Sequence, residues 1–171
     1  MKAEFLVLRL IHILGGIFWV GSMIFTTFFL APVIGSSPAV AGQVMAGLQK
    51  RRLFLALPVV ALLTIASGLR LLSIASIGFS RAYFSTPTGR TFATSAVAAT
   101  IAFLLSLSVS RPGFVRIGRL SASLAGAPDD GARQQIAAEI QRLGRRVAIA
   151  NSFVMVLLLL AAAGMAIARY V

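Results

Sequence analysis

The residues most able to do chemistry lie together in the first long apolar run of the chain. Arg9 and His12 are three residues apart, which places them near one face of a helix and about 4.5 Å apart along its axis. Trp19 follows His12 by seven residues and returns to the same face, with Gly15 and Gly16 between them. A helix here therefore presents a cation, an imidazole, a bare stretch of backbone and an indole in one stripe.

Such a stripe suits a haem group. Imidazole is a common axial ligand of haem iron, glycines let a flat macrocycle approach the backbone, and arginines at the rim pair with carboxylates such as propionates. We expect His12 to be the iron ligand, surrounded by Arg9, Gly16, Trp19 and, from the second apolar run, Arg70. The same spacing also fits a structural role, in which His12 bonds another helix, Trp19 fills the core and Arg9 extends to the membrane surface.

Other chemistries find less support in the residue types. The chain has no cysteine, which excludes disulfides and thiolate metal sites. Its acidic residues are Glu4, Asp129, Asp130 and Glu139, all outside the apolar runs, which argues against a carboxylate pair for acid–base catalysis. A copper path needs several histidines or methionines, and His12 is the only histidine.

Long apolar runs dominate the chain. Its residues are 58% hydrophobic and only 12% charged, against roughly half hydrophobic in soluble domains. About 20 helical residues cross a hydrocarbon layer of about 30 Å, and four runs approach or exceed that length, at about residues 5–33, 53–77, 92–109 and 147–167. The first is too long for the apolar part of a signal peptide. We therefore predict one all-α domain over residues 1–171, a transmembrane four-helix bundle.

The basic residues predict the orientation of the bundle. Ten of them fall in the loops after the first and third runs, and four fall on the opposite side: Lys2, Arg81, Arg90 and Arg169. Because positive residues favour the cytoplasm, we expect a multi-pass protein of the cell inner membrane with both termini in the periplasm. We therefore expect the net charge of +12 to interact with the headgroups of an anionic lipid bilayer rather than with nucleic acid.

The loop between the third and fourth runs contains helix signals of its own. Pro112 and Gly113 are expected to end the third span, and residues 128–130 to start a new helix. Apolar residues then recur at helical spacing over residues 131–146, with Gln and Arg between them. This pattern predicts either an amphipathic helix along the membrane surface or a solvated extension of the fourth span.

Two segments resemble a known family, the CopD-like membrane proteins, which include the copper-resistance protein D domain and the HemJ-type protoporphyrinogen oxidases. The first segment, residues 10–32, shares His12, Trp19, Gly21 and Pro32, and the second, residues 50–72, shares a basic cluster, Pro58 and Ser67-Gly68-Leu69. The resemblance implies a four-helix bundle that binds haem b through His12. In HemJ-type members it implies oxidation of protoporphyrinogen. An arginine and a second histidine usually follow the proline in those oxidases and are absent after Pro32, so no reaction is assigned.

Three functions remain open from the sequence. The first is a haem b-binding redox protein that uses His12. The second is a non-catalytic accessory or scaffold subunit, which functions in a membrane complex or as a homo-oligomer. The third is transport of copper or of a small solute, which the scarcity of polar groups within the apolar runs disfavours. Whether the chain is an enzyme is left undecided.

Overall fold

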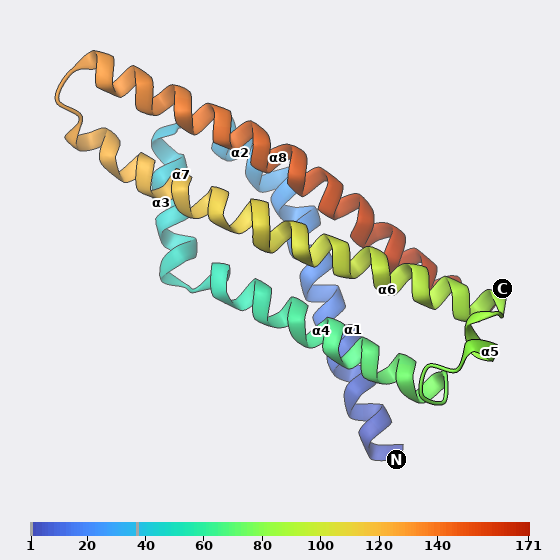
Figure 1. Ribbon diagram of the computed structural model, residues 1–171. Coiled ribbons are helices and arrows are strands. Elements are labelled where there is room, and N and C mark those ends of the chain that lie inside the picture. Colours follow the sequence, from blue (N-terminus) through green and yellow to red (C-terminus); the bar gives the residue numbers. More distant parts are fainter. Residues whose placement is uncertain (1, 37) are drawn as a thin grey trace.

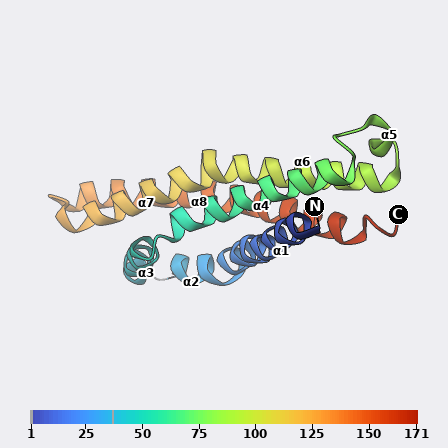
Figure 2. The ribbon, with the colours of Figure 1, turned by 90° about the horizontal axis from the view of Figure 1, so that it is seen from below.

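The computed structural model of the protein describes residues 2–36 and 38–171, and this part of the chain contains helices and no strand. Four helical segments are long and apolar enough to cross a membrane: Lys2–Val33, Leu53–Ala75, Pro87–Ser123 and Asp130–Ile167. The predicted all-α class with four membrane spans is therefore confirmed. Figure 2 shows an elongated molecule, with the α7–α8 connection at one end and α5 with the C-terminus at the other.

The first and third spans are each built from three consecutive helical pieces. The first comprises α1 (Lys2–Phe25), η1 (Thr26–Leu30) and α2 (Ala31–Ser36). The third comprises α6 (Pro87–Leu105), η2 (Ser106–Ser110) and α7 (Arg111–Ser123). The second and fourth spans are the single helices α4 (Leu53–Ala75) and α8 (Asp130–Ile167). The connecting elements are α3 (Pro38–Lys50), α5 (Arg81–Phe84) and η3 (Leu124–Gly126).

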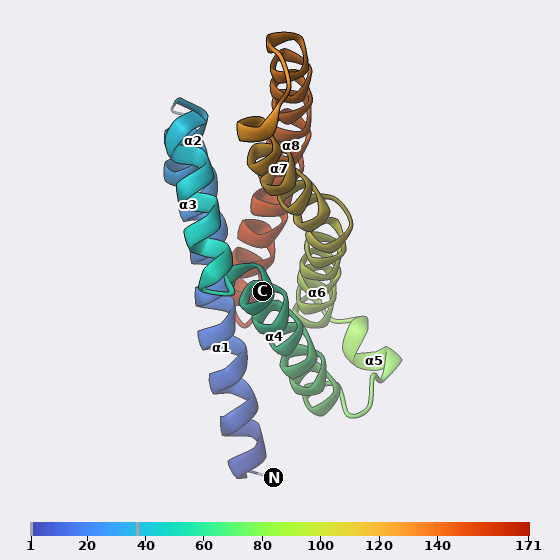
Figure 3. The ribbon, with the colours of Figure 1, turned by 90° about the vertical axis from the view of Figure 1, so that its left-hand side faces the viewer.

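The spans pack as two antiparallel pairs. α1 packs along α4, and α6 with α7 packs along α8 (Figure 1). The pairs meet through contacts of α4 with α6 and of α1 with α8. Figure 3 shows α2 and α3 on one side, and α7 with the first part of α8 on the other, and α3 contacts both α4 and α7.

The core where the four spans meet is small. It consists of Trp19, Ala61, Ala102, Val154 and Leu158, one or two residues from each span. The small side chains of Ala61 and Ala102 let the helices approach closely. Close packing matters because the burial of apolar surface alone does little to drive helix association in a bilayer. Large apolar side chains instead cover the outer faces of the spans, where lipid tails are their natural solvent.

The two π-helical pieces each precede a proline. η1 ends two residues before Pro32, and η2 ends two residues before Pro112. A proline inside an α-helix lacks the N–H donor and its ring clashes with the carbonyl four residues earlier. The wider π turn relieves this crowding: the Arg111 N–H donates to the Ser106 carbonyl, five residues back. The expectation that Pro112 and Gly113 end the third span is therefore wrong for the helix itself, which continues through both residues into α7.

The loop between the third and fourth spans forms a helical hairpin. Asp129 accepts the Ala132 N–H through Oδ1 at 2.6 Å and caps the start of α8, as the sequence predicts. Residues 131–146 belong to the same unbroken helix as the fourth span and pack against α7. Of the two alternatives, an extension of the span is therefore what the structure contains. The helix α3 between the first two spans was not predicted.

Candidate functional site

His12 faces α4 and is held by one hydrogen bond. Its Nδ1 lies 2.8 Å from the carbonyl oxygen of Thr64. Because a carbonyl can only accept, Nδ1 must carry the hydrogen, and in the neutral ring the lone pair then lies on Nε2. Nε2 makes no hydrogen bond to any residue that the structure describes. The imidazole is thus fixed in one tautomer, with one nitrogen free to accept or to ligate.

Gly68 of α4 makes room for this ring, and Thr64 of the same helix bonds it. A Cβ atom placed on Gly68 would lie 2.6 Å from Cε1 and 2.8 Å from Nδ1 of His12, which is closer than real Cβ atoms approach. The Thr64 carbonyl accepts a second side-chain hydrogen bond, from Ser67 Oγ at 3.0 Å. Sequence reasoning did not assign Thr64 to the site, although the small residues Thr64 and Gly68 at four-residue spacing are a signal for close helix packing.

Thr64 also occupies the space beside the glycines of α1. A Cβ on Gly15 would collide with Thr64 Oγ1, and a Cβ on Gly16 would lie 3.9 Å from Thr64 Cγ2. The backbone that the sequence leaves bare is therefore covered by α4. In this structure the two glycines permit the close approach of α1 and α4.

Trp19 lies in the core where the spans meet. Only 4% of its surface is exposed, and its ring meets Phe103 of α6 edge to face at a centroid distance of 6.2 Å. Met23, one turn further along α1, packs against the same core. Trp19 therefore ties the α1–α4 pair to the α6–α8 pair.

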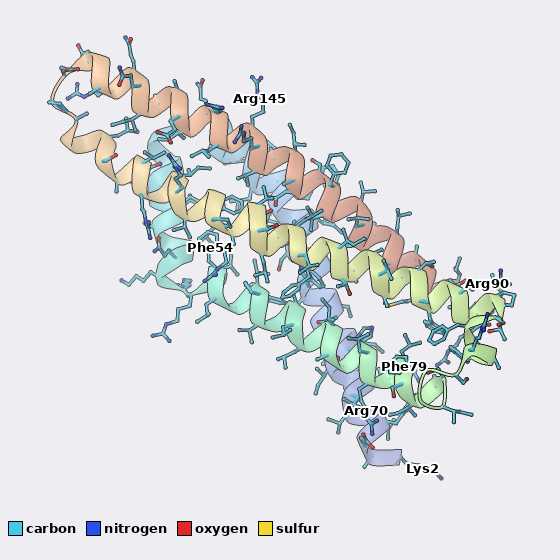
Figure 4. The ribbon with its side chains drawn as sticks, viewed as in Figure 1. Lys2, Phe54, Arg70, Phe79, Arg90 and Arg145 are labelled. Carbon is cyan, nitrogen blue, oxygen red and sulfur yellow. The ribbon has the colours of Figure 1, made fainter. Side chains whose placement is uncertain are left out.

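The two arginines of the expected site differ in their surroundings. Arg70 donates from Nε at 3.0 Å and from a terminal nitrogen at 2.8 Å to the same oxygen of Glu4, which links the end of α4 to the start of α1. Figure 4 shows Arg70 at this end of the molecule, near Lys2. Arg9 is exposed and forms no ion pair within the described chain. Of the two cations, only Arg9 has no acidic neighbour.

A second polar contact lies buried on the other side of the bundle. Ser110, in the π turn η2, donates its hydroxyl to Asn151 Oδ1 of α8 at 2.7 Å. Both residues are buried, at 6% exposure. The two residues are far apart in sequence, and sequence reasoning missed the pair because neither residue carries a charge.

A site with several metal-ligating side chains does not form in the described parts of the chain. No three His, Cys, Asp or Glu side chains cluster there. Haem iron or another metal near α1 would therefore have His12 as its ligand from this chain.

Comparison with family models, curated proteins and solved structures gives no match for this chain. Fold and composition define its class as a multi-pass α-helical membrane protein.

Proposed function

We propose that this integral membrane protein binds haem b, with His12 Nε2 as an axial ligand, in a redox role. The observation that carries the proposal is the hydrogen bond between His12 Nδ1 and the Thr64 carbonyl, which leaves Nε2 without a partner. Metal-ligating histidines almost always donate their other ring N–H in this way, and the bond fixes the ring and increases its basicity. The resemblance of the first two spans to CopD-like proteins, carried by His12, Trp19 and Gly21, points in the same direction.

Arg9 supports the proposal independently. It lies one helical turn from His12, toward the N-terminal end of α1, and has no acidic neighbour in the described chain. A guanidinium in this position would pair with a propionate. Arg70 lies at the same end and would need to release Glu4 to do so. Bound haem would supply one-electron chemistry at its iron, and the chain's own residues would ligate, orient and neutralise it.

The decisive experiment is an absorption spectrum of the protein purified from haem-supplied membranes. We expect a Soret band at about one haem per chain. The variant His12→Asn keeps an N–H at the position of Nδ1 that can donate to the Thr64 carbonyl but lacks the nitrogen at the position of Nε2, so it should remain folded and lose the band. Arg9→Gln should keep the band and release haem faster.

Two results would overturn the proposal. One is wild-type protein that remains colourless after purification from haem-supplied membranes. The other is a Soret band of unchanged intensity in folded His12→Asn. Gly144→Ala in α8 is the control outside the proposed site, because a Cβ there meets no atom within 4 Å, and it should behave as the wild type.

A second candidate function is a non-catalytic accessory or scaffold subunit. The observation that favours it is the tight fit of Thr64 and Gly68 around Gly15 and His12, which gives these residues a packing role without any ligand. Native mass spectrometry from mild detergent tests it. A second protein or a second copy retained at fixed stoichiometry supports a subunit role, and a chain that always runs alone contradicts it.

A further inference from the structure

A shallow, open groove runs along one face of α7 on the strongly basic side of the bundle. Its lining combines two arginines with apolar side chains and one hydroxyl: Pro112, Val115, Arg116, Arg119, Leu120 and Ser123. Val115 is 40% exposed, so the groove offers an apolar surface beside the cations. The groove lies far along the molecule from His12, and nothing in the proposed haem site uses it.

Counted along the third span, the groove begins at the depth of the lipid headgroups and continues beyond them. About 20 residues counted from Phe92 place the edge of the hydrocarbon layer near Arg111. With a rise of 1.5 Å per residue, the backbone of Arg116 is about 8 Å beyond this edge and that of Arg119 about 12 Å. The headgroup layer is about 5 to 8 Å thick, and arginine side chains extend back toward the membrane. Both guanidinium groups can therefore reach lipid phosphates.

The charges around the groove are not balanced by the chain. Ten basic residues belong to this side of the bundle, against three acidic ones, Asp129, Asp130 and Glu139. Asp129 caps α8, Asp130 pairs with Arg133, and Glu139 pairs with Arg116. Arg119 has no acidic neighbour among the described residues. Each acidic group is already engaged, which leaves Arg119 available to an external anion.

We propose that this groove is a binding site for an anionic phospholipid of the same leaflet. Arg119 contacts the phosphate, Arg116 adds a second cation at the cost of weakening its pair with Glu139, and the lipid's glycerol and first methylenes lie on Pro112 and Val115. The exposed apolar residues favour a lipid over a free phosphate ion, because an inorganic anion gains nothing from them.

Nanodiscs that contain the full chain and a mixture of phosphatidylglycerol and phosphatidylcholine test the proposal. Native mass spectrometry of the released protein reports which lipid stays bound. We expect phosphatidylglycerol to be retained selectively and Arg119→Gln to reduce its retention about fivefold. Arg119→Lys should restore most of it. Arg133→Gln is the control, because it removes the same charge from an exposed arginine beyond the groove.

Three results would overturn the proposal. Equal loss of lipid in Arg133→Gln and Arg119→Gln would mean that only the overall charge matters. Equal retention of both lipids by the wild type would mean that the groove does not select anionic headgroups. Thermal stabilisation by inorganic phosphate alone, as large as that by phosphatidylglycerol and equally lost in Arg119→Gln, would assign the groove to a soluble phosphate ligand.

Discussion

The imidazole of His12 lies against the bare backbone of Gly68, so that a single Cβ on Gly68 would come within 2.6 Å of it. The same ring bonds the Thr64 carbonyl at 2.8 Å, one turn earlier on α4. The position of the only histidine is therefore set by the absence of a side chain on the neighbouring helix. Any function of His12, structural or chemical, depends on this contact.

Gly68→Ala should destabilise the α1–α4 pair. The added methyl group must push the His12 ring away from the Thr64 carbonyl, and overpacking of this kind costs about 1 to 3 kcal/mol. Thermal unfolding in detergent, followed by circular dichroism, measures the effect. If haem is bound, its yield should fall in the same variant.

Gly21→Ala on α1 is the control for that measurement. Its Cβ meets nothing within 4 Å, and alanine favours a helix over glycine by about 0.5 to 1 kcal/mol. Its melting temperature should be unchanged or slightly higher. If Gly68→Ala melts at the wild-type temperature, the close contact between His12 and Gly68 is not what holds α1 against α4.

The buried pair of Ser110 and Asn151 should contribute measurably to the second helix pair. Ser110→Ala removes the hydroxyl that donates to the Asn151 amide, and polar contacts between membrane helices contribute about 0.6 kcal/mol on average, with a maximum near 1.7. A double-mutant cycle with Asn151→Leu, measured by unfolding in mixed micelles, isolates the pair. A coupling free energy of zero would show that the two residues act independently.

The ion pair between Glu4 and Arg70 should contribute little to stability. Both side chains are about half exposed, at 44% and 54%, and exposed pairs contribute about 0 to 1 kcal/mol. Glu4→Gln should lower the unfolding free energy by less than that amount, and raising the salt concentration should remove the difference. A larger loss that persists in high salt would mean that the pair is shielded from water in the membrane.

The absence of cysteine in the sequence makes the topology directly testable. We expect S85C, in the loop before α6, to react with a membrane-impermeant maleimide in intact spheroplasts. A137C, on the exposed part of α8, should react only after the membrane is opened. We expect this pattern because the excess of basic residues should hold the α7–α8 side in the cytoplasm. The reverse labelling pattern would place both termini in the cytoplasm.

The sequence predicts those parts of the structure that depend on a single helix. Run lengths predict the four spans, and Asp129 with its neighbours predicts the start of α8. The surroundings of His12 depend instead on the register between α1 and α4. The residue pattern within either helix does not indicate this register. For the same reason the sequence suggested open backbone at Gly15 and Gly16, where the structure has Thr64.

The continuation of the third helix through Pro112 also could not be predicted from the residue pattern of that helix alone. A proline usually ends or kinks a helix, so Pro112 suggested a break. The π turn over Ser106–Ser110 accommodates the proline, and α7 continues along α8. The pairing of Ser110 with Asn151 and the groove on α7 both follow from that continuation.

The π turns also affect how the length of this chain can change in evolution. A π turn contains one residue more than the α turn it replaces, so it accommodates a single-residue insertion. Where Pro112 is replaced as well, a deletion within Ser106–Ser110 can be absorbed as the turn tightens, and the residues of α7 keep their directions. A deletion within α7 itself would rotate every later side chain by about 100°. Homologous chains that differ by one residue should therefore differ in these two turns, and the faces on either side should stay in register.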